Sequence, residues 1–440
     1  MERLTTDDAL FLDLEDEVSA MHNVTVAVLD GPEPALAEVL SRVADRVAAV
    51  PRLRQRVVDV PFHLARPAWI DDPSFAVDYH VRHTGLPRRA TLTDLRNLVG
   101  RLQSQRLDRG KPLWELWMVS GLPGRRWALV SKAHYAMIDG VSGADPLSLV
   151  IDQARERPGV AGWDPGPAPS GADLVGRAVA ELVFDPVEQL RLARRTLGRP
   201  FGLVAGLRPR PAPAPSAGLT GAVGPHRRWQ EAEIEVEAVR RVRDELDVAT
   251  NDVVLGLITW GLRAMLLARG ETPPPTIRTL APLAIATGDR FTNEVSALEA
   301  DLPVGSDDVT DMIRHIHGQT APAAGRRKAV EGAMLADLRG LVAPTLCSLG
   351  LRAATRAGAR VEAVQTVTVN APGPHQPITV LERPMARLHP AIPLVAQVRL
   401  AVGVMSYRSH FGFGVTGDRD AGMDVAAVAD GIVEAVSLVP

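Results

Sequence analysis

A proline-rich segment, RPRPAPAPS at Arg208–Ser216, divides the chain and limits what it can fold into. Alternating proline disfavours helix and sheet and is typical of an extended linker. The chain has 440 residues, so about 200 residues lie on either side, which suits one domain each. We therefore predict an N-terminal domain over 1–175, a helical and proline-rich linker over 176–220, and a C-terminal domain over 221–440.

Both halves alternate between strand and helix patterns, which predicts an α/β class of the α+β sandwich type. The first half has expected strands at 23–29, 54–60 and 76–82, and expected helices at 4–13, 34–50, 92–105, 142–155 and 175–197. The second half has expected strands at 229–236, 364–370, 397–407 and 409–415, and expected helices at 251–269, 309–319, 327–360 and 425–436. Two more strands, 114–120 and 126–132, flank the turn sequence GLPGR and predict a hairpin.

The hairpin leads directly into the motif His134-Tyr-Ala-Met-Ile-Asp139-Gly140. Imidazole titrates near neutral pH, so a histidine at a strand end is a candidate proton-transfer group. The glycine allows a tight turn or a close backbone approach. A lone histidine at a strand end is more often an ordinary structural residue than a catalytic one. The sequence around the motif is needed to distinguish these two interpretations.

Composition excludes several classes of function. A formal net charge of -3 gives no general attraction to nucleic acid. Cys347 is the only cysteine, so neither an intrachain disulfide nor a thiolate metal cluster can form. The sequence has no HExxH, CxxC, GxxxxGK[ST] or strand-borne GxGxxG, and we expect neither a metal nor a bound nucleotide cofactor. The apolar run at 253–262 is shorter than the roughly 18 residues of a membrane span, which leaves peripheral membrane contact.

Beyond these patterns, the chain resembles the bacterial wax ester synthase/diacylglycerol acyltransferase family along nearly its whole length. The matching segments of the first half are LTTDDALFLDLE (4–15), FAVDYHVRH (75–83), LDRGKPLWELWMVSGL (107–122) and SKAHYAMIDGVSG (131–143). Those of the second half are TNDVVLG (250–256), FTNEVSALEADLP (291–303), VNAPGP (369–374) and HFGFGVTGDRDAGMD (410–424).

The resemblance implies two chloramphenicol-acetyltransferase-like halves with a tunnel at their junction. It implies transfer of a fatty acyl group from acyl-CoA, as co-substrate, to diacylglycerol or a long-chain alcohol, which yields triacylglycerol or wax ester. It also implies a cytoplasmic location, peripheral to the inner membrane or to lipid droplets. The amphipathic stretches at 175–199 and 326–360 could rest on such a surface or pack between the halves.

In the family the motif usually reads His-His-x-x-x-Asp-Gly, and the second histidine is the catalytic base. Tyr135 holds that position here, and a phenol with a pKa near 10 is only about 0.1% ionised at pH 7. We therefore expect His134 to act as the base and Tyr135 to donate a hydrogen bond. The resemblance implies that Asp139 and Gly140 shape the loop.

Other candidate residues follow from the matching segments. Asn251 and Asp252 begin a helix, where they could cap free N–H groups or shape the tunnel. The turn with Asn370, Pro372 and Gly373 is expected near the active site, either in contact with substrate or as structure alone. Asp108, just before the PLW sequence, could anchor the motif loop through a partner that the sequence does not identify.

Two alternative functions stay open at this point. A catalytically weak or inactive relative could bind acyl chains or a partner in the same tunnel, because the usual histidine is Tyr135. Acyl transfer to another acceptor, such as a sugar or a polyketide alcohol, is the other alternative.

Overall fold

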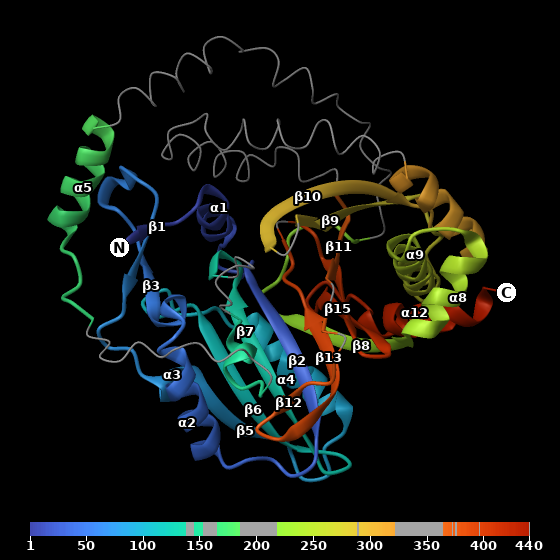
Figure 1. Cartoon of the computed structure of the whole chain (residues 1–440). Helices are drawn as coiled ribbons and strands as arrows, with labels where there is room; N and C mark the ends of the chain where they lie inside the picture. The colour runs from blue at the N-terminus through green and yellow to red at the C-terminus, as the bar shows by residue number, and fades with distance from the viewer. Residues whose placement is uncertain are drawn as a thin grey trace.

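Two six-stranded sheets form the framework of the protein (Figure 1). The structure is a computed structural model, and it describes residues 1–137, 145–152, 165–184, 218–287, 290–321, 364–371, 373–374, 376–395 and 397–439. The predicted helix at 327–360 therefore lies outside the described residues.

The first sheet has the strand order β12-β13-β2-β7-β6-β5. Its strands are β12 (Thr379–Val380), β13 (Arg383–Ala391), β2 (His22–Asp30), β7 (Arg126–His134), β6 (Trp114–Leu122) and β5 (Val81–Gly85). Neighbours are antiparallel except β5 and β6. Alternate residues of β2 point to opposite faces, so Ala27 and Leu29 pack with helix α2 (Leu36–Val47), whereas Val24 and Val26 pack with α4 (Leu92–Ser104).

A small three-stranded sheet and two helices, α1 and α5, lie beside the first sheet. The sheet has the order β1 (Glu2–Arg3), β4 (Ala68–Asp71) and β3 (Gln55–Val58). Helix α1 (Thr6–Leu14) follows β1, and Thr5 caps it by accepting a hydrogen bond from the Asp8 amide at 3.1 Å. Helix α5 (Gly171–Phe184) lies at the outer edge of the molecule in Figure 1.

The second sheet has the strand order β10-β9-β11-β14-β15-β8. Its strands are β10 (Arg290–Leu302), β9 (Ile277–Thr287), β11 (Thr366–Ala371), β14 (Leu400–Tyr407), β15 (His410–Asp418) and β8 (Arg227–Glu235). Helices α8 (Val236–Leu246), α9 (Thr250–Ala268) and α12 (Val425–Leu438) share one large hydrophobic core with this sheet.

Helix α9 is apolar and long enough, by length and composition alone, to cross a membrane. However, 67% of its apolar window is buried inside the protein. Val254, Ile258 and Leu262 belong to the second core. Burial of this kind is typical of a central helix in a folded domain. Helix α9 is longer than the apolar run at 253–262 that the sequence analysis considered.

The second half of the chain contributes strands to the first sheet, because β13 pairs with β2. β13 also passes very close to β15, where a Cβ on Gly414 would lie 1.6 Å from the Pro390 carbonyl oxygen. Only glycine permits that approach. The domain boundaries stay a prediction, but this crossing shows that the two halves of the sequence do not form two separate sheets.

Most expected elements lie within a few residues of the observed ones, but some assignments were wrong. Residues 76–82 were expected to form a strand, but Val77–His80 form a helical turn (α3) and β5 begins only at Val81. The buried ring of His80 stacks on Trp114 at 4.5 Å and its Nδ1 is 2.8 Å from the Trp114 carbonyl oxygen, and these contacts hold the turn.

Several other elements differ from the predictions. Of the helix expected over 142–155, the described part holds a short 3₁₀ turn, η4 (Pro146–Leu149). The expected helix over 175–197 begins earlier, as α5, and the part of that prediction after residue 184 lies outside the described residues. Helix α8 and strands β1, β4, β9, β10, β12 and β13 were not predicted.

Candidate active site

The motif begins at the end of a central strand of the first sheet. β7 ends at His134, which pairs with His22 of β2, and the 3₁₀ turn η3 (Tyr135–Met137) follows. The strand is paired on both sides, so the position of the motif backbone is fixed by the sheet. Asp139 and Gly140 lie outside the described residues, and their predicted role in shaping the loop stays a prediction.

Both ring nitrogens of His134 are engaged. The Nδ1 atom is 3.1 Å from the Ala136 amide, which can only donate, so Nδ1 carries no proton. Nε2 then carries the proton and donates to the Glu15 carboxylate at 3.1 Å. Burial lowers the pKa of His134, although the hydrogen bond to Glu15 acts in the opposite direction. In this arrangement neither nitrogen is free to accept a proton from a substrate.

Glu15, directly after α1, is the charged centre of the contacts around His134. Its side chain is 2% exposed and accepts hydrogen bonds from Arg106 and Arg109 as well as from His134. Burial alone would raise the pKa of Glu15, but the contacts with His134, Arg109 and Arg106 outweigh it and lower the pKa to about 2. The carboxylate is therefore charged at neutral pH.

Tyr135 is held by its backbone and its ring rather than through its hydroxyl. Its amide donates to the Met21 carbonyl at 3.0 Å, and its ring stacks on Phe11 of α1 with 5.3 Å between the centroids. Burial raises the pKa of the phenol to about 12, so the hydroxyl stays protonated at neutral pH. Among the residues that the structure describes, none forms a hydrogen bond with this hydroxyl.

Other polar groups lie buried on the same strands. His22 is fully buried, with Nε2 at 2.9 Å from the Gln103 carbonyl oxygen, and burial holds its pKa well below the ordinary value. Lys132 is also fully buried and donates to the Gln105 carbonyl, and burial lowers its pKa to about 8. These groups make the inner part of the first sheet sensitive to protonation.

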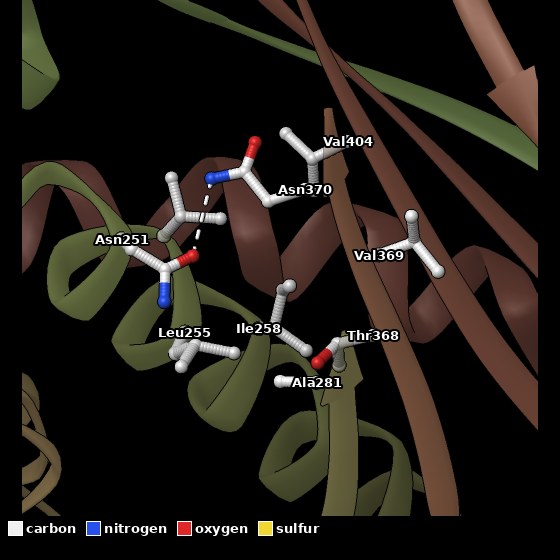
Figure 2. Close-up of a pocket in the computed structure, with 9 residues that line it drawn as sticks. Asn251, Leu255, Ile258, Ala281, Thr368, Val369, Asn370 and Val404 are labelled. Atoms are coloured by element: carbon white, nitrogen blue, oxygen red, sulfur yellow. Dashed lines mark hydrogen bonds between the residues drawn. The ribbon is translucent and has the colours of Figure 1, made fainter. Parts of the chain in front are cut away.

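A second group of predicted residues meets in the other half. The Asn370 amide donates to the Asn251 side-chain oxygen at 3.2 Å, which joins the end of β11 to the start of α9. Both line a cavity of about 10 Å³, the room that one water needs. Figure 2 shows the two amides facing each other, with apolar side chains of α9 and the sheet around the cavity. The sequence-predicted pair is thus brought together.

Two other predicted residues have structural contacts instead. Asp252 is 1% exposed and its carboxylate accepts from the Ala249 amide at 3.1 Å and from Thr320 at 2.7 Å, so it caps α9 as one of the two alternatives proposed. The Gly373 amide donates to the Ser406 hydroxyl at 3.0 Å, and a Cβ there would lie 1.8 Å from the Ser406 carbonyl oxygen. Pro372 lies outside the described residues.

The end of β14 connects the two groups of residues. Val404 pairs with Asn370 and lines the cavity. Tyr407, three residues further along β14, belongs to the first-half core cluster that also contains Met137 of the motif turn, and Met405 packs against that cluster. The motif turn from the first half and the Asn251–Asn370 pair from the second half therefore both lie near the end of β14.

The residues that hold His134 and Tyr135 were not predicted from the sequence. Glu15 and Phe11 lie in the N-terminal segment that carries the family resemblance, yet no role was assigned to them. The Asp108 carboxylate accepts from the Gly110 amide at 2.8 Å in its own turn. Residues 138–144 lie outside the described residues, so its expected contact with the motif loop stays a prediction. Its neighbour Arg109 reaches Glu15.

No metal site is evident in the described part of the chain, where no three His, Cys, Asp or Glu side chains come together. The expectation that the protein needs no cofactor stays a prediction from the sequence.

Comparisons with known proteins agree with this architecture over the full length. A family model for the wax ester synthase/diacylglycerol acyltransferase catalytic domain matches residues 4–254, and one for the C-terminal domain of that family matches 291–439. A relative from Mycobacterium tuberculosis H37Rv, named as a probable diacylglycerol O-acyltransferase, is 32% identical over 452 positions, which cover 99% of this chain and 95% of the relative.

Solved structures show the same fold. The wax ester synthase/diacylglycerol acyltransferase from Marinobacter aquaeolei VT8 has a TM-score of 0.73 at 20% identity, covering 100% of this chain and 98% of that one. The first condensation domain of the calcium-dependent antibiotic synthetase has a TM-score of 0.57 at 15% identity, covering 100% and 96%. The expected fold of two chloramphenicol-acetyltransferase-like halves is confirmed, and the chain belongs to the wax ester synthase/diacylglycerol acyltransferase family and is an acyltransferase.

Proposed function

We propose that this protein transfers a fatty acyl group from acyl-CoA to the hydroxyl of diacylglycerol or of a long-chain alcohol. The coarser activity, acyl transfer that forms a neutral lipid, follows from membership of the family. The observation that carries the proposal is similarity to a named diacylglycerol O-acyltransferase over 99% of the chain. A silent relative that only binds acyl chains is not favoured by these comparisons.

The reaction needs one proton to move. The acceptor oxygen attacks the thioester carbonyl carbon, the C–S bond breaks, and the hydroxyl proton of the acceptor ends on the sulfur of CoA. Proton transfer by a positioned side chain typically accelerates such a step by about 10²–10⁴-fold. The usual histidine is absent at position 135, and His134 is fully engaged with Glu15 and Ala136.

Tyr135 is the group that we assign to this proton transfer. A phenol oxygen can accept one hydrogen bond and donate another at the same time. Tyr135 Oη would take the acceptor's proton while its own proton passes to the departing sulfur, so the phenol is unchanged after each turnover. A pKa of about 12 suits this relay, because the hydroxyl must carry its proton at neutral pH. It does not suit a base that works as a free phenolate.

The place of action follows from the substrates. Diacylglycerol and long-chain alcohols dissolve in lipid rather than in water, which supports a protein that works in the cytoplasm against the inner membrane or a lipid droplet. Acyl-CoA, in contrast, is delivered from the aqueous side. No resident cofactor takes part in this chemistry.

The test is acceptor-dependent release of CoA. Purified protein is given palmitoyl-CoA with radiolabelled acyl chains, with and without dioleoylglycerol or hexadecanol, and the lipid products are separated by chromatography. The expected result is labelled triacylglycerol or wax ester together with CoA release that depends on the acceptor. Free fatty acid alone, or no CoA release with either acceptor, would contradict the proposal.

The pH profile distinguishes the relay from a histidine base. With Tyr135 as the relay, kcat should be nearly constant between about pH 6 and pH 8, because a phenol with a pKa near 12 does not titrate there. The Tyr135→His variant should show kcat rising through a pKa near about 6.5. A native profile that rises through a pKa below the ordinary histidine value would instead assign the base to His134, because burial lowers the pKa of that residue.

A further inference from the structure

The loop between α1 and β2, residues 15–21, contacts both described polar residues of the motif. At its start, the Glu15 carboxylate accepts a hydrogen bond from His134 Nε2 at 3.1 Å. At its end, the Met21 carbonyl accepts one from the Tyr135 amide at 3.0 Å. The Glu15 carboxylate also accepts from the Met21 amide at 3.3 Å, which joins the two ends of the loop. The placement of the motif therefore depends on how this 15–21 loop is held.

The middle of the 15–21 loop is bound from the second half of the chain. Arg227, the first residue of β8, donates from Nη2 to the Val18 carbonyl, across 209 positions of sequence. The same turn is braced from within, because the Asp16 carboxylate accepts from the Val18 and Ser19 amides at 2.9 and 2.7 Å. Arg227 thus binds a turn whose own geometry is already fixed.

The Arg227 side chain is itself held in one orientation. The residue is 7% exposed, and Nη1 donates to the Gly224 carbonyl. Its amide donates to the Ser104 hydroxyl at the end of α4 at 2.9 Å, and a Cβ on Gly100 of α4 would lie 2.7 Å from the Arg227 carbonyl oxygen. Burial of a guanidinium costs free energy, which these carbonyls and the charge of nearby Asp418 offset. An arginine fixed in this way can fix the group that it binds.

The proposed proton transfer tolerates little movement of Tyr135. Its hydroxyl has to lie within hydrogen-bond distance of the acceptor oxygen. A misplacement of about 1 Å can cost about 100-fold in rate. Because the 15–21 loop binds the His134 ring and the Tyr135 backbone, movement of the loop displaces the hydroxyl as well.

We propose that Arg227 is a positioning residue for acyl transfer, which holds the 15–21 loop, and through it His134 and Tyr135, from the opposite half. This role rests on the proposed function for the reaction that it assists. It also makes the geometry of the motif depend on the docking of β8 against the first half.

The first test needs no catalytic activity. Full-length protein labelled with ¹⁵N-histidine is compared by NMR with its variants, and His134→Gln identifies the signals of that ring. Nitrogens with and without a proton give different shifts, so the signals report the contact with Glu15. Arg227→Gln should shift or broaden the His134 signals. Arg228→Gln, the matched control, changes an exposed side chain on the same strand and should leave them unchanged.

The second test measures kcat and KM in the acceptor-dependent CoA-release assay. Arg227→Gln should lower kcat by about 10-fold to 100-fold with KM nearly unchanged, while Arg228→Gln keeps the native rate. Arg227→Lys keeps the buried charge, so it should recover part of the loss and preserve the fold if glutamine does not. The double variant with Glu15→Gln should lose less than the product of the two single effects, because both residues act through the same loop.

The outcomes separate this role from the proposed function. His134 signals that move in Arg227→Gln support the positioning role even if no CoA is released, a result that would contradict the proposed function alone. Unchanged His134 signals in Arg227→Gln would overturn the role, as would a native kcat in a variant that merely unfolds at a lower temperature. Losses that multiply fully in the double variant would overturn it too, since Arg227 and Glu15 would then act independently.

Discussion

Replacing Glu15 by glutamine should destabilise the protein. The buried Glu15 carboxylate contacts three side chains, those of His134, Arg106 and Arg109. The side chain is 2% exposed, and its pKa lies at about 2 instead of the ordinary 4.5. That difference corresponds to about 3 kcal/mol at neutral pH, which is an upper estimate of what the charge contributes. Glutamine keeps the shape of the side chain but loses this charge.

The expected shift of the unfolding temperature is small but measurable. Unfolding of 440 residues carries an entropy of about 0.9 kcal/mol per degree, so about 3 kcal/mol lowers Tm by about 3 °C if the chain unfolds as one unit. If the first half unfolds separately, the shift is about twice as large. Differential scanning calorimetry at pH 7.5 measures it.

A matched control makes this experiment decisive. Glu17, two residues further along, is exposed, and Glu17→Gln should leave Tm within about 0.5 °C of the native value. If Glu15→Gln and Glu17→Gln unfold at the same temperature, the contacts among Glu15, His134 and the two arginines do not stabilise the fold. The reasoning about how the motif is positioned would then be wrong.

Three further predictions concern stability. His22 is neutral in the folded protein and becomes protonated in the unfolded chain when the pH falls. Lowering the pH from 7 to 5 should therefore reduce the free energy of unfolding by about 2 kcal/mol. Urea unfolding at both pH values measures this loss, which should be absent in His22→Gln. Gly414→Ala should cost about 3 kcal/mol or more in the same assay, because its Cβ would meet the Pro390 carbonyl, whereas Gly318→Ala, with open space around it, should not destabilise. Asp252→Ala should lose about 1–2 kcal/mol in urea unfolding by removing the cap of α9, and an unchanged midpoint would show that the cap is dispensable.

Local patterns predicted much of the fold. β2, α4 and the β6–β7 hairpin lie within about two residues of their predicted bounds, because alternation and helical spacing are properties of a short stretch. Helix α8 was missed although Val239 and Val242 carry the helical spacing. The pairing of β13 with β2 had no local signal, because it joins residues more than 350 positions apart.

The candidate site was also predicted only in part, because local motifs were visible in the sequence and distant contacts were not. The sequence motif located His134 and Tyr135 at a strand end, and the family resemblance singled out Asn251 and Asn370. Neither the motif nor the resemblance identified the partner of His134, because Glu15 lies 119 positions earlier in the chain. His134 was expected to be the base, and that role stays a prediction, but a histidine with both nitrogens engaged is better suited to hold Tyr135 in place.

The most direct test of the proposed mechanism is the kcat of Tyr135→Phe in the acceptor-dependent CoA-release assay, beside Tyr79→Phe as a control tyrosine in the first half. Phenylalanine keeps the ring that stacks on Phe11 and removes only the hydroxyl. A proton relay through Tyr135 predicts that Tyr135→Phe lowers kcat by at least about 100-fold with KM nearly unchanged, while Tyr79→Phe stays at the native rate. If Tyr135→Phe turns over as fast as the native enzyme, the hydroxyl takes no part in proton transfer and the mechanism is wrong.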